Sequence, residues 1–259
     1  MSSILWEPTE EILNKSNIES LKRYINNKYS LNIKTYSELH LWSIDNISDF
    51  WSCVWLDCQI KYSKNYSNIV DDENKMPGAK WFKSSRFNFA ENLLKYNNSN
   101  NAIEFYCEDN ITYKLSYSEL YNLVSKTSKL MIKLGIKKGD RIVAVMPNIP
   151  ETVVCMLACT SIGAIWSSCS PEFGEEGILD RFMQINPKLL IFSDGYYFKG
   201  KQHSIVKKIK KIFDSIRTIN NVLCINIINE SIKFKHIKWS NVLESKRSKI
   251  KFEQLPFNH

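Results

Sequence analysis

The sequence has no apolar stretch long enough to span a bilayer. The longest candidate, from Thr152 to Trp166, is too short and is interrupted by Thr160 and Ser161. The first residues, Met-Ser-Ser-Ile-Leu-Trp-Glu-Pro, contain no basic region followed by an apolar block. We therefore expect neither a targeting segment nor a membrane span.

Cysteine pairs with the spacing of metal or redox motifs are also missing. The chain has 7 cysteines, and no two of them form a Cys-x-x-Cys motif. Most lie in apolar segments, a position typical of reduced core residues in a cytosolic protein. We expect a cytoplasmic protein without disulfides or zinc.

Histidine is scarce, with 4 residues at positions 40, 203, 236 and 259. They show neither helical spacing nor carboxylate neighbours, so the sequence predicts no catalytic histidine and no metal site. The pair Ser167-Ser168 lacks the flanking glycines of a nucleophile elbow. The sequence thus offers no catalytic residue of its own.

The charge balance is basic, with a formal net charge of +8. Lysine is spread through the chain together with asparagine, and no basic motif interleaved with aromatic residues is present. A nucleic-acid partner rests on charge alone, and we do not expect one. A small polyanionic ligand fits a moderate basic excess as well.

A ladder of short apolar runs and helical segments occupies the middle of the chain. The runs are too short for helices and have turn residues nearby, as expected of buried parallel strands; they are Ile142 to Met146, Ala164 to Cys169 and Leu189 to Phe192. One helix should begin near Asn148, Pro150 and Glu151 and end at Gly163. A second should run from Glu175 to Ile185. The alternation predicts an α/β fold with a parallel sheet covered by helices on both faces.

Further elements are expected on either side of this ladder. Before it we predict a helical pattern over 9–29, a helix capped by Ser48, a loop over 62–75, and a hairpin of Ala102 to Cys107 with Ile111 to Leu115 about Glu108-Asp109-Asn110. A capping box at Ser116 and Glu119 then opens a helix that Gly135 ends. After the ladder we predict a turn at 193–195, a loop over 196–203, a helix with solvated lysines, and a strand from Val222 to Ile228. The aromatic residues after Ser48 are expected to pack in the core.

Two segments resemble the adenylate-forming acyl-CoA synthetases. The first is Gly-Ile-Lys-Lys-Gly-Asp-Arg-Ile-Val-Ala-Val-Met-Pro-Asn-Ile-Pro-Glu-Thr, from residue 135. The second, Gly-Ala-Ile-Trp-Ser-Ser-Cys-Ser-Pro-Glu-Phe-Gly from residue 163, resembles the subfamily of acetoacetyl-CoA synthetases, as does Asn-Phe-Ala-Glu-Asn-Leu-Leu from residue 88. The resemblance implies a helical N-terminal extension over 1–95 and the first part of the AMP-binding domain over 96–259.

The resemblance also implies a reaction, ATP-dependent ligation of acetoacetate to CoA through an acyl-adenylate. The complete enzymes use ATP, Mg²⁺ and CoA, and hold the ATP phosphates on a Ser/Thr/Gly-rich loop that ends in Lys. No such loop occurs in these 259 residues. In the family it follows the equivalent of Leu255-Pro256-Phe257-Asn258-His259, and the domain with the catalytic lysine follows later. We expect no ATP site here, an inactive chain on its own, and a separate C-terminal half as a possible partner.

The resemblance places CoA against two loops of this half. The first aligns with Ser170, Pro171, Glu172 and Phe173. The second, Arg-x-Gly-Arg in related acetyl-CoA synthetases, aligns with 198–201, where Phe198 and Lys201 replace the arginines, so Lys199, Gly200 and Lys201 are the candidates. Lysine meets a phosphate as a point charge without the bidentate fork of arginine. The alternative is a plain turn with solvated lysines.

Two functions therefore remain open. The chain is the N-terminal portion of an acetoacetate–CoA ligase, or it is a non-catalytic remnant or split subunit that binds CoA or a partner chain.

Overall fold

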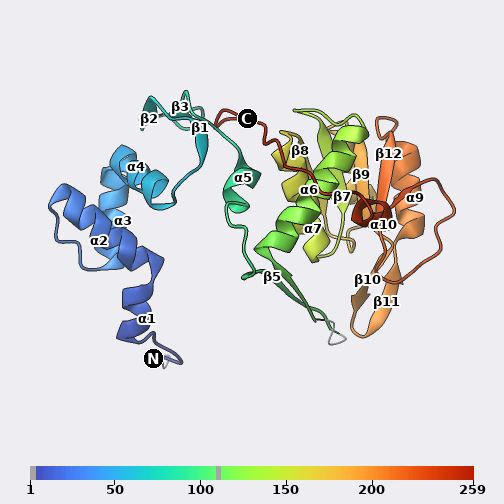
Figure 1. Cartoon of the computed structure of the whole chain (residues 1–259), viewed down its shortest axis with the longest axis horizontal. Helices are drawn as coiled ribbons and strands as arrows, with labels where there is room; N and C mark the ends of the chain where they lie inside the picture. The colour runs from blue at the N-terminus through green and yellow to red at the C-terminus, as the bar shows by residue number, and fades with distance from the viewer. Residues whose placement is uncertain (1–3, 109–111) are drawn as a thin grey trace. The chain divides into compact units, whose positions relative to one another are not determined.

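The computed structural model describes residues 4–108 and 112–259, which form two compact units. Unit 1 comprises residues 1–86 and 256–259, and unit 2 comprises residues 87–255. Residues 109–111 lie outside the described residues, so the predicted turn at Asp109 and Asn110 is not described. Figure 1 labels most of the elements of the two units.

Unit 1 contains four helices and short strands among the described residues. Their bounds are α1 (Glu10–Lys15), α2 (Asn17–Tyr29), α3 (Tyr36–Asp45), α4 (Ile47–Asp57), β1 (Tyr62–Lys64), β2 (Asn68–Val70), β3 (Trp81–Lys83) and β4 (Arg86–Phe87), the last at the boundary with unit 2. The helices enclose a small core that includes Leu21, Ile25, Leu39 and Cys53. Beside it Trp55 is buried and stacks on Phe82, with ring centroids 4.8 Å apart. The expected packing role of the aromatic residues is confirmed for Trp55, whereas Trp51 is 40% exposed.

Three predictions for unit 1 were wrong in detail. The pattern over 9–29 is two helices, because the Ser16 hydroxyl donates to the Leu13 carbonyl and accepts from the Glu19 N–H, which starts α2. Ser48 does not cap α4; Asn46 precedes the helix, and the Ser48 hydroxyl donates to the Glu73 carboxylate at 2.6 Å. The predicted loop over 62–75 contains β1 and β2, which are too short to show an alternating pattern.

Unit 2 is built on a five-stranded parallel sheet in the order β13-β12-β9-β7-β8. The strands are β7 (Arg141–Val145), β8 (Ile165–Cys169), β9 (Leu189–Ser193), β12 (Asn221–Ile225) and β13 (Ile237–Lys238). The helices of this unit are α5 (Phe89–Leu93), α6 (Tyr117–Lys133), α7 (Pro150–Ser161), α8 (Glu175–Met183), α9 (Val206–Ser215) and α10 (Trp239–Leu243). Two hairpins flank the sheet: β5 (Asn101–Tyr106) with β6 (Thr112–Ser116), and β10 (Gly195–Phe198) with β11 (Lys201–Ser204).

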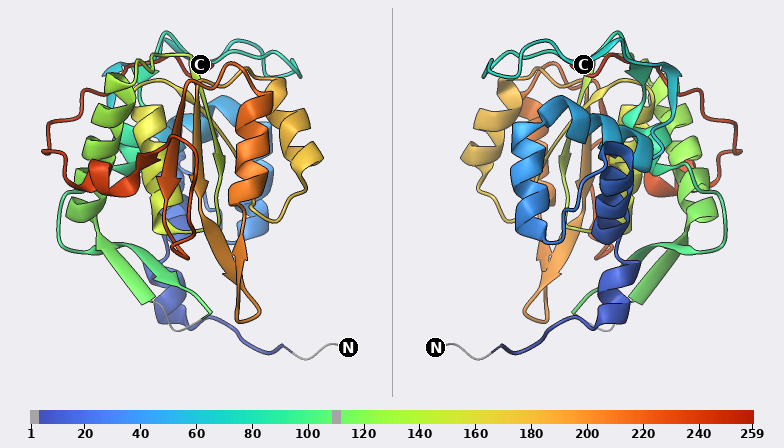
Figure 2. Two further views of the ribbon diagram at one scale, coloured as in Figure 1. Left: turned by 90° about the vertical axis from the view of Figure 1, so that its right-hand side faces the viewer. Right: turned by 90° about the vertical axis from the view of Figure 1, so that its left-hand side faces the viewer.

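The alternation of side chains along each strand divides the core between the two faces of the sheet. On β7, Ile142 and Ala144 belong to the core beneath α6 and α7, while Val143 and Val145 belong to the core beneath α8 and α9. The left-hand view in Figure 2 shows α6 and α7 (green to yellow) on one side of the strands and α8 and α9 (gold to orange) on the other. The predicted α/β fold with both faces covered is confirmed.

The boundaries of the helices follow local signals in the sequence. The Ser116–Glu119 capping box opens α6, and Pro150 occupies the first turn of α7. After α7, Gly163 has φ +72°, in the left-handed region that favours glycine. The Asn88 side chain caps α5 and also donates to the carbonyls of Thr160 and Glu253 at 3.0 and 2.8 Å. It thereby joins three segments of unit 2 that are distant in sequence.

Three predictions for unit 2 need correction. The segment Ala164 to Cys169 is not a buried strand, because β8 is at the edge of the sheet and Ile165 and Ser168 are exposed. The predicted turn at 193–195 and loop over 196–203 are the end of β9 and the β10–β11 hairpin. In α9, Lys208 is half-buried rather than solvated, and donates to the carbonyls of Pro171 and Phe173.

Candidate functional site

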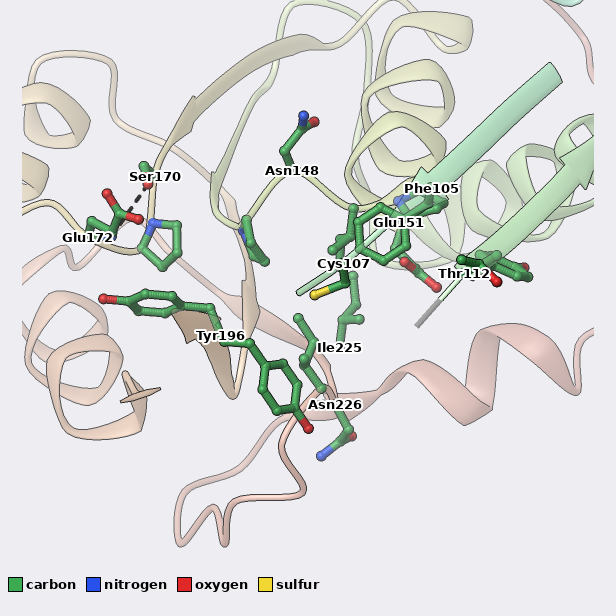
Figure 3. A pocket seen from close by; sticks show the side chains of 17 residues that line it. Phe105, Cys107, Thr112, Asn148, Glu151, Ser170, Glu172, Tyr196, Ile225 and Asn226 are labelled. Carbon is green, nitrogen blue, oxygen red and sulfur yellow. Dashed lines mark hydrogen bonds between the residues drawn. The ribbon is translucent and has the colours of Figure 1, made fainter. Parts of the chain in front are cut away.

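A pocket of about 700 Å³ lies at the carboxyl ends of the parallel strands of unit 2. It is lined by segments that follow β7 and β8, by the start of β10, by the end of β12 and by the β5–β6 hairpin; these are residues 147–151, 170–172, 196–197, 225–227, 105, 107, 112 and 113. Figure 3 shows these side chains around the pocket.

The order of the strands explains why a pocket forms at this place. From β7 the chain crosses to β8 on one side, passes back across β7 to β9 on the other side, and continues from β9 to β12, so the strand order reverses between β7 and β9. The helices that follow β7 and β9 therefore cover different faces, and their loops diverge above the sheet. Open α/β sheets bind ligands at such a switch point. The sheet thus positions the pocket independently of the side chains that line it.

The three predicted CoA residues Ser170, Pro171 and Glu172 line this pocket. They follow β8, and the Ser170 hydroxyl accepts a long hydrogen bond of 3.5 Å from the Glu172 N–H. Pro171 is buried, while Ser170 and Glu172 are exposed. Phe173 is outside the lining; its ring lies 5.0 Å from the guanidinium carbon of Arg181, a cation–π distance.

The other predicted residues, Lys199, Gly200 and Lys201, form the tip of the β10–β11 hairpin and do not line the pocket. The base of the same hairpin does, through Tyr196 and Tyr197. The structure therefore brings the two predicted loops to the same end of the sheet, with one in the pocket wall and the other at the end of a hairpin. Their role in binding CoA stays a prediction.

The Lys208 ammonium fixes the loop after β8 from outside. It donates to the Pro171 carbonyl at 2.8 Å and to the Phe173 carbonyl at 2.7 Å. Desolvation lowers the pKa of Lys208, and Glu175 opposes this effect. A lysine that bonds two carbonyls of one loop restricts the conformations of that loop.

Another buried anchor is Asp194, at the end of β9. Its side chain is fully buried and accepts from the N–H groups of Ile227, Ile228 and Glu230 at 2.6, 3.1 and 3.0 Å. The Asn226 amide donates to it at 3.3 Å. Because Asn226 and Ile227 line the pocket, Asp194 holds one wall in place.

Glu151 is the carboxylate in the lining whose pKa is perturbed. It lies in the first turn of α7, where the helix dipole favours a negative charge, yet desolvation by burial raises its pKa. Burial therefore outweighs the dipole. The same wall contains Tyr113, whose pKa is raised by desolvation first and then by the charge of Glu151.

Sequence reasoning missed Tyr196, Tyr197, Asn226 and Glu151 as pocket residues. A signal for the tyrosines was present: Tyr-Tyr-Phe-Lys-Gly-Lys-Gln-His has a glycine in a short polar turn between residues suited to strands, which is a hairpin pattern. Glu151 was recognised as part of a helix start but not as a pocket residue. Its burial depends on the β5–β6 hairpin beside it, which is distant in sequence.

The described residues contain neither a cluster of metal-binding side chains nor a helix that could span a membrane. Within residues 4–108 and 112–259, no group of three or more His, Cys, Asp or Glu side chains is placed to hold a metal ion. In the same ranges, no helix is long and apolar enough to cross a bilayer. The cysteines in these ranges are all free, and five of them are buried while Cys58 is exposed and Cys107 half-buried.

Taken together, the strand order and the pocket define a doubly wound α/β protein with a pocket at its strand ends. The chain belongs to the AMP-binding enzyme family, whose model matches residues 94–250. A second family model, "Acetyl-coenzyme A synthetase N-terminus", matches residues 36–93. The expected resemblance to adenylate-forming synthetases is confirmed.

Individual relatives agree with this assignment. The chain is 41% identical to the acetoacetyl-coenzyme A synthetase of Rhizobium meliloti over 212 residues, which is 82% of this chain and 32% of the relative. It is 34% identical to the acetoacetyl-CoA synthetase of Xenopus tropicalis, over 100% of this chain and 40% of the relative. The solved acetoacetyl-CoA synthetase from Streptomyces lividans matches all of this chain and 40% of its own, with a TM-score of 0.91 and 28% identity. The chain thus spans 32 to 40% of the length of these relatives.

Proposed function

We propose that this protein is the N-terminal part of an ATP-dependent ligase that joins acetoacetate to CoA, and that the pocket of unit 2 receives the CoA. One observation carries the proposal: the pocket at the switch point of the sheet is walled by Ser170, Pro171 and Glu172. The resemblance assigns this loop to CoA, and the fold independently predicts a ligand there.

The composition of the pocket suits a nucleotide with an extended polar chain. Tyr196, Tyr197 and Phe105 offer aromatic surfaces for a base, and Ser170 and Asn226 offer hydrogen-bonding groups. Lys199 and Lys201 at the hairpin tip offer positive charge for phosphates. Because both lysines are exposed, each should contribute only about 1 kcal/mol or less, and binding should weaken with salt.

The adenylation step requires groups that this sequence does not contain. In complete enzymes of the family, a phosphate loop holds ATP, and Mg²⁺ neutralises charge during formation of the acyl-adenylate. The 259 residues include no Ser/Thr/Gly-rich loop ending in Lys. We propose that the chain by itself forms no acetoacetyl-adenylate and depends on a C-terminal half for catalysis.

The second candidate is a non-catalytic CoA-binding or partner-binding module. The same sequence observation supports it, since the loops that the resemblance assigns to CoA lie in this chain while the sequence contains no phosphate loop. Sequencing the transcript beyond the His259 codon separates the candidates. An in-frame or neighbouring Ser-Gly-Thr-Thr-Gly-x-Pro-Lys stretch supports the ligase, and its absence supports the module.

Calorimetric titration of CoA at low ionic strength tests the site. We expect weak binding that is reduced by Tyr196→Ala and by the double variant Lys199→Ala, Lys201→Ala. The double variant Lys207→Ala, Lys233→Ala removes the same charge away from the pocket and serves as the control. Equal affinity in all four proteins would refute the proposed site. Acetoacetate-dependent exchange of ATP with pyrophosphate, measured on the same chain, should not exceed a heat-treated control.

A further inference from the structure

The tip of the β10–β11 hairpin carries two backbone N–H groups that the hairpin itself does not use. Phe198 pairs with Lys201, so Lys199 and Gly200 are the two residues of the turn. Both have positive φ, 52° and 67°, as in a type I′ turn. Consecutive N–H groups in a tight turn of this kind form a concave donor surface that attracts anions.

This donor surface is occupied by a carboxylate. The Gly200 N–H donates to Glu108 Oε2 at 3.0 Å. The pKa of Glu108 is held below its usual value first by this bond and then by the Lys199 N–H, with desolvation acting in the opposite direction. The turn therefore binds an oxyanion, which in this structure is the carboxylate of Glu108.

Glu108 reaches the turn from the other hairpin that flanks the pocket. It follows β5, and its neighbour Cys107 lines the pocket, as do Tyr196 and Tyr197 of the other hairpin. Figure 1 shows both hairpins extending from the same end of unit 2. The Glu108–Gly200 hydrogen bond thus joins two hairpins that both contribute residues to the lining of the pocket.

The occupied turn is also flanked by positive charge. Lys199 lies over the Phe198 ring at 5.3 Å from its centroid, and within residues 4–108 and 112–259 no ion pair is found for Lys199 or Lys201. Lysine at positive φ is sterically unfavourable, yet here it brings an ammonium group beside two backbone donors. A phosphate monoester offers more negative charge and more acceptor oxygens than a carboxylate.

In the proposed function the Lys199–Gly200 turn meets the phosphates of CoA, and we infer that the Glu108 carboxylate competes with such a phosphate for the Gly200 N–H and so lowers the affinity. Glu108 is exposed, so a phosphate can displace it without unfolding the hairpin. The inference rests on the proposed function in taking CoA, with its ribose 3′-phosphate, as the ligand. Glu108 should therefore oppose CoA binding, and removing its charge should strengthen it.

The test compares Glu108→Gln with Glu104→Gln. Glu104 is an exposed carboxylate on β5, the strand that precedes Glu108. It contacts Asn101, Tyr106 and Lys114, so it is a control for the loss of one charge. Titration of CoA at low ionic strength should show Glu108→Gln binding about two- to five-fold more tightly than wild type, the size typical of exposed charge pairs. Dephospho-CoA should bind all three proteins alike. Glu108→Asp, whose shorter side chain reaches the turn less well, should resemble Glu108→Gln.

A second measurement separates this inference from the proposed function. In ¹⁵N NMR spectra, the Gly200 amide of Glu108→Gln should shift with millimolar inorganic phosphate, while wild type and Glu104→Gln respond less. If no protein binds CoA but this difference remains, the CoA proposal fails and the anion-binding turn stands. If CoA binds equally to wild type and Glu108→Gln, or less tightly to the variant, the competition by Glu108 is refuted. An unchanged Gly200 resonance in Glu108→Gln also refutes it.

Discussion

At the scale of single residues, the fully buried Asp194 carboxylate organises the wall of the pocket formed by residues 225–227. Asp194→Ala would leave the N–H groups of Ile227, Ile228 and Glu230 without this acceptor. We expect a loss of about 2–4 kcal/mol in the free energy of unfolding, because backbone donors at a partly buried site lose their partner. Asp194→Asn, which keeps one acceptor oxygen, should lose less. Urea denaturation measures both; equal stability of Asp194→Ala and wild type would contradict this role.

Glu151 gives a dependence of stability on pH. Burial raises its pKa above that of the unfolded chain, so the folded state binds this proton more tightly. The resulting contribution to stability is fully present below the unfolded pKa, near 4.5, and is lost as the pH rises through the folded pKa. Glu151→Gln should therefore melt at a higher temperature than wild type at pH 7.5.

The size of this difference should shrink when melting is repeated at pH 5. The matched control is Glu176→Gln, an exposed glutamate in the first turn of α8, for which we expect no such pH-dependent gain. If Glu151→Gln melts below wild type at both pH values, the ionised carboxylate stabilises the folded state, and the expected direction of the pH dependence is wrong.

At the scale of elements, α9 controls the loop after β8 through one lysine. Lys208→Met removes the two hydrogen bonds to the Pro171 and Phe173 carbonyls while keeping an apolar side chain along the helix. Hydrogen exchange in the segment 170–174 should become several-fold faster, and exchange in the core of β9 should not change. Lys207→Met, an exposed neighbour in α9, is the control. Equal exchange in the two variants would show that the loop is held by other contacts.

Local sequence patterns predicted the boundaries of the helices better than the short strands. The capping box of α6, the proline of α7 and the glycine that follows α7 were all predicted correctly, because each signal acts within one turn of its helix. The β10–β11 hairpin and the short strands of unit 1 were missed, since three or four residues give too few alternations to recognise. The position of β8 at the edge was missed because β8 was grouped with β7 and β9 as an apolar run, although Ser167 and Ser168 make it more polar than those strands.

At the scale of the whole molecule, β8 offers an unpaired strand edge. It pairs with β7 and, among residues 4–108 and 112–259, with no second strand, and Ile165 is 44% exposed. Exposed edges of apolar strands promote association between chains. We expect the isolated chain to self-associate in sedimentation velocity and to bind dyes that report apolar surface.

A charge on that edge should reverse the effect. Ile165→Lys is expected to raise the monomer fraction, whereas Ile132→Lys, at an exposed apolar position of α6, should change it less. A wild-type chain that sediments as a single monomer and melts cooperatively without dye binding would argue that this edge causes no association.

The sequence by itself determined the family and the α/β class, because both depend on features contiguous in the chain. The ladder of apolar runs, the helix signals and the segments from residues 135 and 163 need no knowledge of distant contacts. The loop at 170–172 was also found in this way, and it lines the pocket.

Only the tertiary structure decided the chemistry around that loop. Lys208 is 35 or more positions from the carbonyls it bonds, Asp194 is 33 to 36 positions from its backbone donors, and Glu108 is 92 positions from Gly200. Each of these contacts arises because parallel strands bring their carboxyl ends together and two hairpins meet beyond them. The sequence alone does not show which partner a charged residue contacts, because the crossovers of the sheet decide which segments meet. For this reason the lysines of α9 were all predicted to be solvent-exposed, although Lys208 bonds two carbonyls of the loop after β8.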